Sequence, residues 1–190
     1  MVPGFSCEVT GARLVLRSPP GAEWDQDAKR LFSNPKNLVY LPFFLKDWTD
    51  EEITAERDRR RQLQNERLAL NFDIFLSQST FIGIGGFRSI NMEILEGEFG
   101  IILDHTAWRS LFSAESHLLF LRYGFEELKL ETAFARTSEA NVPMVSFFQR
   151  FGIPQTAPPN DEGWLQFTIT ASQWPQVKER LRMALSGAGK

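Results

Sequence analysis

The sequence predicts a single domain of the α+β class, with strands and helices mixed around one sheet. Three observations lead to this fold class. Segments with strand-like and helix-like periodicity alternate along the 190 residues. Three strand-like segments in the middle follow one another with short loops between them, as in an antiparallel meander. The later segments run strand, helix, strand, which requires one crossover.

The composition is that of an ordinary globular protein and excludes several functions. The chain has 43% hydrophobic and 24% charged residues, and its 17 phenylalanines favour a large apolar core. A net charge of −3 gives no field that would hold a nucleic acid. The single cysteine, Cys7, excludes an internal disulfide and a cysteine-based zinc site, and two histidines leave little for other metals. We expect no metal and no nucleic-acid partner.

No stretch of the sequence has the pattern of a membrane span or a secretion signal. Apolar runs stay short of the ~18 residues that a span requires. Glu8 and Arg13 interrupt the first residues, where a signal peptide has an apolar core. A lone thiol is compatible with a reducing compartment. We therefore expect a cytosolic or nuclear protein, assigned to the cytoplasm, with no membrane partner.

The first elements precede the meander. Residues 1–11 are expected to be an N-terminal extension, and a strand over 12–17 ends at a Ser-Pro-Pro-Gly turn. A short helix over 24–32 stops before an Asn-Pro pair. Residues 38–45 are apolar around the helix breaker Pro42, so we expect a loop or a second short helix that packs inward.

A capping box then opens a longer helix. Thr49 is followed three positions later by an acidic residue, which predicts a helix over 50–66. Its charge run, 51–61, contains Glu56 and Arg60 at the i,i+4 spacing of an ion pair. We interpret this run as a solvated helix face, and the alternative is a basic patch for an anionic ligand.

The meander follows this helix. Its strands are predicted over 68–76, 80–87 and 96–103, because the apolar period changes to that of strands. A polar turn at 77–79 and a loop at 89–95 connect them.

The remaining elements alternate between helix and strand. Apolar residues at spacings of three and four make 111–128 the strongest amphipathic helix. Pro143 in the first turn and Gly152 past the end delimit a helix over 141–151. The other expected elements are a strand over 130–136, a polar loop over 154–163, a strand over 164–169, a helix over 172–185 and a flexible tail over 186–190.

Five segments of the chain together resemble a known family. They are Gly97-Glu98-Phe99-Gly100-Ile101-Ile102-Leu103-Asp104; Trp108 with Glu115; Tyr123-Gly124-Phe125-Glu126-Glu127-Leu128-Lys129-Leu130; Asn141 with Phe151-Gly152; and Thr168-Ile169-Thr170 with Trp174-Pro175. In this order they resemble the GCN5-related N-acetyltransferases (GNAT), and within them the RimJ/RimL-like ribosomal-protein N-terminal acetyltransferases. The resemblance covers one domain, 12–185, and implies the GNAT fold, a central mixed, mostly antiparallel twisted sheet with helices on both faces.

The resemblance implies an enzyme. A protein of this kind is an acetyl-CoA-dependent N-acetyltransferase, which moves an acetyl group to a primary amine by direct attack in a ternary complex. The amine belongs to a peptide N-terminus or to a small molecule. Acetyl-CoA is then the cosubstrate, no metal is needed, and a monomer or homodimer is expected. The alternative is a non-catalytic acyl-CoA-binding or protein-interaction module on the same scaffold.

The resemblance also implies where acetyl-CoA binds. In the family the strand equivalent to 98–103 splays from its neighbour, so the free backbone groups of Ile101, Ile102 and Leu103 pair with the pantetheine amides. The following loop turns its amides toward the pyrophosphate, and the next helix points its positive N-terminus at the phosphates. This loop corresponds here to Trp108, Arg109, Ser110, Leu111, Phe112, Ser113 and Ala114.

The loop departs from the family pattern at two positions. Leu111 replaces the central glycine, and Arg109 replaces a second glycine common in the RimJ/RimL-like subgroup. If the loop keeps helical dihedral angles, its amides stay available, and Arg109 or the loop hydroxyls add phosphate contacts. If a close backbone approach requires glycine, Leu111 alters or closes the pocket.

Two further positions concern the thioester. Asn141 matches an asparagine whose amide meets the pantetheine in the family, although an N-cap role is equally natural before a helix. Phe148 stands where many members carry a tyrosine that protonates the departing thiolate, and it has no proton to give. Ser146 is the candidate acid in its place; otherwise the thiolate leaves without an acid or the chemistry is slow.

Glu98 is the candidate base, because several family members place a carboxylate at this strand position. A lysine-like amine must spend roughly 4.6 kcal/mol to lose its proton at pH 7, whereas an α-amine spends about 1 kcal/mol. An α-amine therefore needs little help. The alternative for Glu98 is a solvated strand carboxylate or an ion pair. A lone turn histidine such as His105 is more often a surface residue, and His117 is expected to be structural.

Acidic residues flank the presumed acceptor entry. They would raise the local concentration of cationic amines, and the alternative is a helix N-terminal charge cluster with a solvated loop. These residues are Asp47, Asp50, Glu51, Glu52, Asp161 and Glu162.

Overall fold

The computed structural model describes residues 5–76, 79–108 and 111–187. The strands are β1 (Cys7–Thr10), β2 (Leu14–Ser18), β3 (Leu70–Leu76), β4 (Thr80–Asn91), β5 (Glu96–Leu103), β6 (Thr132–Ser138), β7 (Gln155–Ala157) and β8 (Trp164–Thr170). The helices are α1 (Asp25–Ser33), α2 (Asp50–Asn65), α3 (Phe112–Arg122), α4 (Val142–Phe151) and α5 (Trp174–Gly187). Short 3-10 turns lie at Ala22–Trp24, Pro42–Phe44 and His105–Ala107, and a π-helical turn at Tyr123–Glu127 extends α3.

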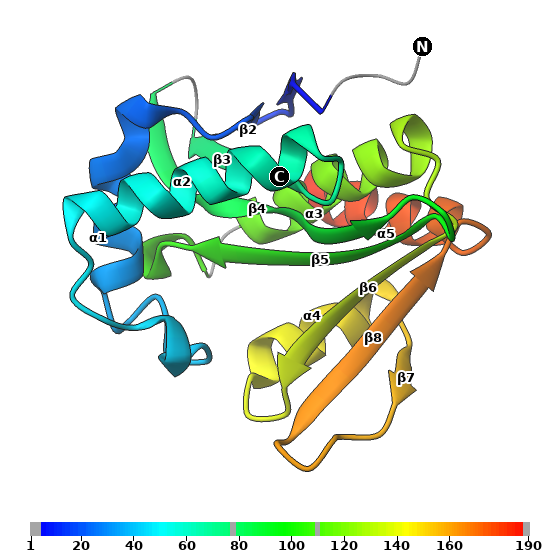
Figure 1. Ribbon diagram of the computed structural model, residues 1–190. Helices are drawn as coiled ribbons and strands as arrows, with labels where there is room; N and C mark the ends of the chain where they lie inside the picture. Colours follow the sequence, from blue (N-terminus) through cyan, green and yellow to red (C-terminus); the bar gives the residue numbers. More distant parts are fainter. Residues whose placement is uncertain (1–4, 77–78, 109–110, 188–190) are drawn as a thin grey trace.

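The described strands form one sheet in the order β1-β2-β3-β4-β5-β6-β8-β7 (Figure 1). Every neighbouring pair is antiparallel except β5 and β6, which run parallel. The sheet is therefore mixed and mostly antiparallel, as the sequence predicts. The single parallel pair is produced by the crossover through α3.

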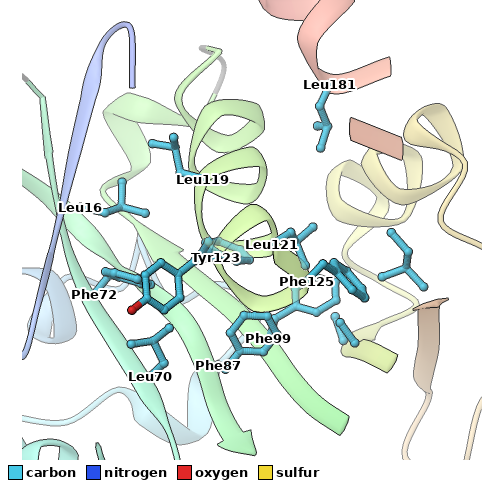
Figure 2. Packing of buried hydrophobic residues seen from close by; sticks show 14 of the residues in the cluster. Leu16, Leu70, Phe72, Phe87, Phe99, Leu119, Leu121, Tyr123, Phe125 and Leu181 are labelled. Carbon is cyan, nitrogen blue, oxygen red and sulfur yellow. The ribbon is translucent and has the colours of Figure 1, made fainter. Parts of the chain in front are cut away.

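Helices cover both faces of the sheet, and each face has its own apolar cluster. On one face Ile102 of β5 packs with Phe32 of α1 and Ile53 of α2. On the other face Phe99 belongs to the larger cluster with α3, α4 and α5. Figure 2 shows the side chains of this larger cluster close together, including those of Phe87 and Phe99. The expected large, phenylalanine-rich core is confirmed, since seven phenylalanines are among the largest fully buried side chains.

Several segments expected to be irregular form regular structure. Strand β1 lies within the expected N-terminal extension, β7 lies within the expected loop over 154–163, and β4 continues into the expected loop over 89–95. The last helix includes residues 186–187 of the expected tail, while 188–190 lie outside the described residues. Strands of three or four residues are too short to show an alternation, which explains why β1 and β7 were not predicted.

Helix α2 confirms one expectation and corrects another. Its capping box is present: the Thr49 side chain accepts from Glu52 N–H, and the Glu52 side chain accepts from Thr49 N–H. The expected pair between Glu56 and Arg60 is wrong, because Glu56 pairs with Arg59 instead. Arg60 is only 6% exposed, so the predicted fully solvated face is also incorrect there.

The parallel pairing of β5 and β6 is short, and the place where it ends determines where the candidate site lies. β5 and β6 pair only from Glu96–Thr132 to Glu98–Phe134. Beyond this point they diverge, as Figure 1 shows, while β6 stays paired with β8. The backbone of β5 after Glu98 is consequently unpaired on the side that faces β6, and a wedge opens in the sheet.

Candidate active site

A cavity of about 550 Å³ occupies this wedge. Helix α2 and strands β3 and β4 form one side of it, and α3, β6 and α4 form the other. The predicted site residues that line it are Ile101, Ile102, Leu103, Trp108, Leu111, Ser113, Ala114, Asn141 and Phe148. Arg109 and Ser110 lie outside the described residues. Phe112 instead packs against the larger apolar cluster.

The start of α3 shows which interpretation of Leu111 the backbone supports. Leu111 has φ −71° and ψ −2°, in the right-handed helical region, and its carbonyl accepts from Glu115 N–H at 2.9 Å. A position with these angles does not require glycine. The missing glycine therefore causes no backbone strain, and the first amides of α3 border the cavity beside Ser113 and Ala114.

The loop before α3 is held by contacts that the sequence did not reveal. Trp108 Nε1 donates to the carbonyl of Leu103 at 2.9 Å, and Tyr40 stacks on Trp108 with ring centroids 6.2 Å apart. The backbone N–H of His105 donates to Asn37 Oδ1 at 2.8 Å, and its Nδ1 lies 3.0 Å from the same oxygen. The segment before α2 is thereby fixed to the loop, and His105 has a structural role.

The same segment reaches across the wedge. Phe43 makes an edge contact with Trp164 of β8, their ring centroids 6.1 Å apart, although Phe43 is 64% exposed. Tyr40, Leu41 and Phe44 line the cavity. The expectation that 38–45 packs inward is thus right for Leu38, which is buried, and wrong for Phe43.

Helix α4 forms the wall opposite α2. Asn141 caps it: its Oδ1 accepts from Met144 N–H at 3.3 Å, and its Nδ2 donates to Thr137 Oγ1 at 3.0 Å. Phe148 is buried against Phe167 with ring centroids 4.7 Å apart. Ser146 does not lie in the cavity but is exposed. The helix faces the cavity with residues at spacings of three and four, and Ser146 falls between them. The structure therefore places Ser146, the candidate acid, away from the cavity.

Glu98 lies at the point where β5 and β6 part. Its side chain is buried between two arginines that line the cavity, but Glu98 itself is not among the lining residues. Arg88 donates a hydrogen bond to Glu98 Oε1, and Arg136 Nε is 3.6 Å from the same oxygen. Oε2 accepts no hydrogen bond from the residues that the structure describes. Arg88 reaches this position because it is the extra residue of a β-bulge between Phe87 and Ser89.

His117 lines the cavity from α3 and carries no charge at neutral pH. Its Nδ1 is 2.8 Å from the carbonyl of Ser113, which can only accept, so Nδ1 bears the proton. Burial lowers the pKa of His117 to about 4. The sequence suggested a structural residue, and the structure shows one that also faces the site.

The charges that line the cavity differ from the expected acidic entry. Asp50 bonds Lys29 and Glu52 bonds Lys46, each at 2.7 Å, and these hydrogen bonds lower the pKa of both carboxyls. Both residues lie in the first turn of α2, which agrees with the alternative interpretation of a charge cluster at a helix N-terminus. Among the described residues, the cavity wall carries one carboxylate, that of Glu56, and several arginines, namely Arg59, Arg60, Arg88, Arg136 and Arg150.

The described part of the chain contains neither a membrane-spanning helix nor a metal-binding cluster of side chains. None of its helices is both long enough and apolar enough to cross a membrane. No group of three or more His, Cys, Asp or Glu side chains in residues 5–76, 79–108 and 111–187 is arranged to hold a metal ion.

Comparison with known proteins defines the family. The family model for the acetyltransferase (GNAT) domain matches residues 13–153. The chain belongs to this family of acetyltransferases. A search of curated proteins found no match.

Solved structures show the same fold. RimJ from Mycobacterium smegmatis, in complex with CoA-disulfide, superposes with a TM-score of 0.82 at 16% identity, over 97% of each chain. RimL, a ribosomal alpha-N-protein acetyltransferase in complex with coenzyme A, gives 0.75 at 13% identity, over 86% of this chain and 98% of its own. Spermidine N-acetyltransferase from Vibrio cholerae, in complex with CoA and spermine, gives 0.74 at 17% identity, over 87% of this chain and 99% of its own. The RimJ/RimL-like resemblance thus holds at the level of the fold.

Proposed function

We propose that the protein transfers an acetyl group from acetyl-CoA to a primary amine. The observation that carries this proposal is the cavity in the wedge, which runs from the arginine-lined face under α2 to the start of α3. Through this cavity, acetyl-CoA bound on one side of the sheet and an amine bound on the other can come into contact. Holding both reactants in one site turns a bimolecular reaction into an effectively unimolecular one.

The proposed binding site of acetyl-CoA is defined by backbone N–H and C=O groups that have no hydrogen-bond partner in the sheet or helix. The β5 backbone beyond Glu98 offers unpaired groups to the pantetheine amides. The first amides of α3 and the positive end of its dipole face the pyrophosphate. Glu115, the acidic residue of this first turn, does not oppose the phosphates, because its carboxylate accepts from Arg13 N–H at 2.7 Å and Leu14 N–H at 3.2 Å on β2's side.

The reaction we propose is direct attack. The amine nitrogen forms a bond to the thioester carbonyl carbon, the carbon–sulfur bond breaks, and the thiolate leaves. The amine gives up one proton, which we route through water to Oε2 of Glu98, and the thiolate gains one from solvent. Phe148 supplies no proton, so this mechanism assigns no side-chain acid. The α-amine of a peptide spends only about 1 kcal/mol to become neutral at pH 7, so among primary amines it needs the least help from the base.

A non-catalytic acyl-CoA-binding module is the second candidate. One observation favours it: Phe148, at the position of the family's proton donor, is 2% exposed and packed on other aromatic rings. Such a protein would bind acetyl-CoA through the same wedge and transfer nothing.

Calorimetry and a thiol-release assay separate the two candidates. Acetyl-CoA is first titrated into the protein, and turnover is then measured with a panel of primary amines: a peptide that has a free N-terminus, small amino carboxylates and small polyamines. The matched control for each acceptor is the same molecule with its amine blocked. Binding with release of thiol only in the presence of the free amine supports the enzyme. Binding without turnover supports the module, and absence of binding contradicts both.

A further inference from the structure

One arginine in the cavity wall differs from its neighbours on α2. Arg57 donates to Asp25 and Asp58, and Arg59 donates twice to Glu56, at 2.7 Å each. Arg60 is 6% exposed, yet its guanidinium makes no hydrogen bond to the residues that the structure describes. Its closest charged contact is Asp73, with Nη1 and Oδ1 3.7 Å apart.

A buried guanidinium with five donors is normally satisfied by hydrogen bonds. Asp73 does not meet this demand. Its other oxygen, Oδ2, already accepts from Gly21 N–H at 3.1 Å, and burial raises the pKa of Asp73. Arg60 therefore presents donors to the cavity that it lines. A planar carboxylate is the group that fits a guanidinium fork.

The surrounding charges favour an anion at this end of the cavity. The guanidiniums of Arg59, Arg60, Arg88 and Arg136 stand near the carboxylates of Glu56, Asp73 and Glu98. Four positive charges thus face at most three negative ones. A cationic surrounding also lowers the pKa of an ammonium group, so it favours the neutral amine that attacks the thioester.

We infer that the acceptor is an amine whose own molecule carries a carboxylate, and that Arg60 binds this carboxylate. The inference rests on the proposed acetyl transfer for the role of the amine. The recognition itself depends only on the geometry around Arg60. The acceptor class is then an amino acid or a similar small amino carboxylate.

Binding is tested without turnover. The protein is saturated with CoA, which has no acetyl group to transfer, and titrated calorimetrically with matched ligands: glycine, gamma-aminobutyrate and epsilon-aminocaproate, each alongside its amide. We expect at least one acid to bind about 10- to 100-fold more tightly than its amide, the range of a charge-assisted pair. Equal binding of acids and amides, or binding of none of the acids, overturns the inference.

Variants then assign the effect to Arg60. Arg60→Gln should bring the acid-to-amide ratio close to one without changing affinity for CoA, and Arg60→Lys should restore part of it. Because Arg60→Gln leaves Asp73 without its counter-charge, the double variant with Asp73→Asn keeps the site neutral. Arg61→Gln is the control, since Arg61 is exposed and its Nη1 donates to Pro20 O, outside the cavity. An unchanged ratio in the Arg60 variants overturns the assignment.

A separate assay with acetyl-CoA distinguishes this inference from the proposed function. Acid-selective binding without acetyl transfer contradicts the proposed function and leaves the carboxylate site in place. Transfer to amines regardless of their carboxylate supports the proposed function and overturns the inference.

Discussion

Glu115 is a buried carboxylate in the first turn of α3, where a negative charge would repel phosphates. It is 2% exposed, and it accepts from two backbone N–H groups and from Arg13 Nη1 at 3.3 Å. Gly11 makes this arrangement possible, because a Cβ there would lie 2.3 Å from Glu115 Oε1. One side chain thus ties α3 to β2 and keeps the start of the helix available.

Loss of this carboxylate should destabilise the fold. We expect Glu115→Ala to lower the free energy of unfolding by about 3 kcal/mol, because it leaves two backbone donors and a guanidinium without an acceptor. Glu115→Gln keeps one acceptor oxygen and should lose less. Glu8→Gln removes an exposed ion pair with Arg17 and should change stability by less than about 0.5 kcal/mol. Urea denaturation of the three variants measures this, and similar losses for Glu115→Ala and Glu8→Gln would contradict it.

His117 should make the fold less stable in mild acid. Its folded-state pKa of about 4 lies below the unfolded value of 6.5, so the unfolded chain binds the extra proton first. The contribution of His117 to the free energy of unfolding is fully present above pH 6.5. It decreases as the pH falls toward 4, by about 3 kcal/mol in total.

The comparison variant is His117→Phe, which keeps a ring among Phe99, Phe120 and Phe147. Denaturation curves for both proteins are recorded between pH 4 and 7. We expect the stability difference between variant and wild type to shift in favour of the variant as the pH falls. A difference that stays constant over this range would show that His117 does not titrate as burial requires.

Glu98 should matter most when the amine still carries its proton. We expect Glu98→Gln to lower kcat by about 100-fold near neutral pH, the lower end of general base catalysis, and to leave acetyl-CoA affinity unchanged. The deficit should shrink as the pH rises through the pKa of the amine. Glu96→Gln is the control, because Glu96 lies two residues earlier on the same strand, at the end of the β5–β6 pairing that is farther from the wedge. Equal turnover of Glu98→Gln and wild type at every pH would exclude Glu98 as the base.

At the scale of elements, the sequence predicted the ends of helices correctly where a capping residue sets the boundary. The Thr49 capping box and Gly152, which has φ +74° at the end of α4, are such cases. The extent of β4 could not be predicted in this way. The bulge at Arg88 interrupts the alternation of apolar and polar residues, and only pairing with β5 shows that the strand continues to Asn91.

The cap of α4 offers a test of the two roles assigned to Asn141. Asn141→Ala should cost about 1 kcal/mol of stability, because the Met144 N–H loses its acceptor. Asn141→Asp keeps an acceptor at this position and should retain the stability. It loses the Nδ2 donor, so we expect it to weaken acetyl-CoA binding. Melting curves and calorimetry on both variants decide the matter. Wild-type affinity in Asn141→Asp would leave capping as the only role of this side chain.

At the scale of the whole molecule, the site combines elements that are far apart in sequence. The family motifs pointed to β5, α3 and α4, and these do border the cavity. The opposite wall could not be predicted, because the charge run of α2 gives no sign that Arg60 turns inward toward β3. Its periodicity is that of a solvated helix, and only packing on the sheet buries this position. The expected acidic entry could not be tested from the sequence either, because only the structure shows that Asp50 and Glu52 pair with Lys29 and Lys46.

The wedge also predicts how the molecule responds to its substrate. β5 and β6 share only the three residue pairs from Glu96–Thr132 to Glu98–Phe134, so a ligand seated between them joins the two parts of the sheet. Acetyl-CoA at 100 times its dissociation constant should raise the free energy of unfolding by about 2.7 kcal/mol. Amide hydrogen exchange locates this effect.

We expect acetyl-CoA to slow exchange most at the amides of residues 99–103 that do not pair with β4, and at the first turn of α3. Amides of the paired residues 14–17 and 73–76 in the β2–β3 ladder, which do not line the cavity, should show only the general stabilisation. Free pantetheine should protect residues 99–103 without protecting α3, because it lacks the pyrophosphate. Uniform slowing over the whole sheet, or protection of α3 by pantetheine, would contradict this placement of the substrate along β5.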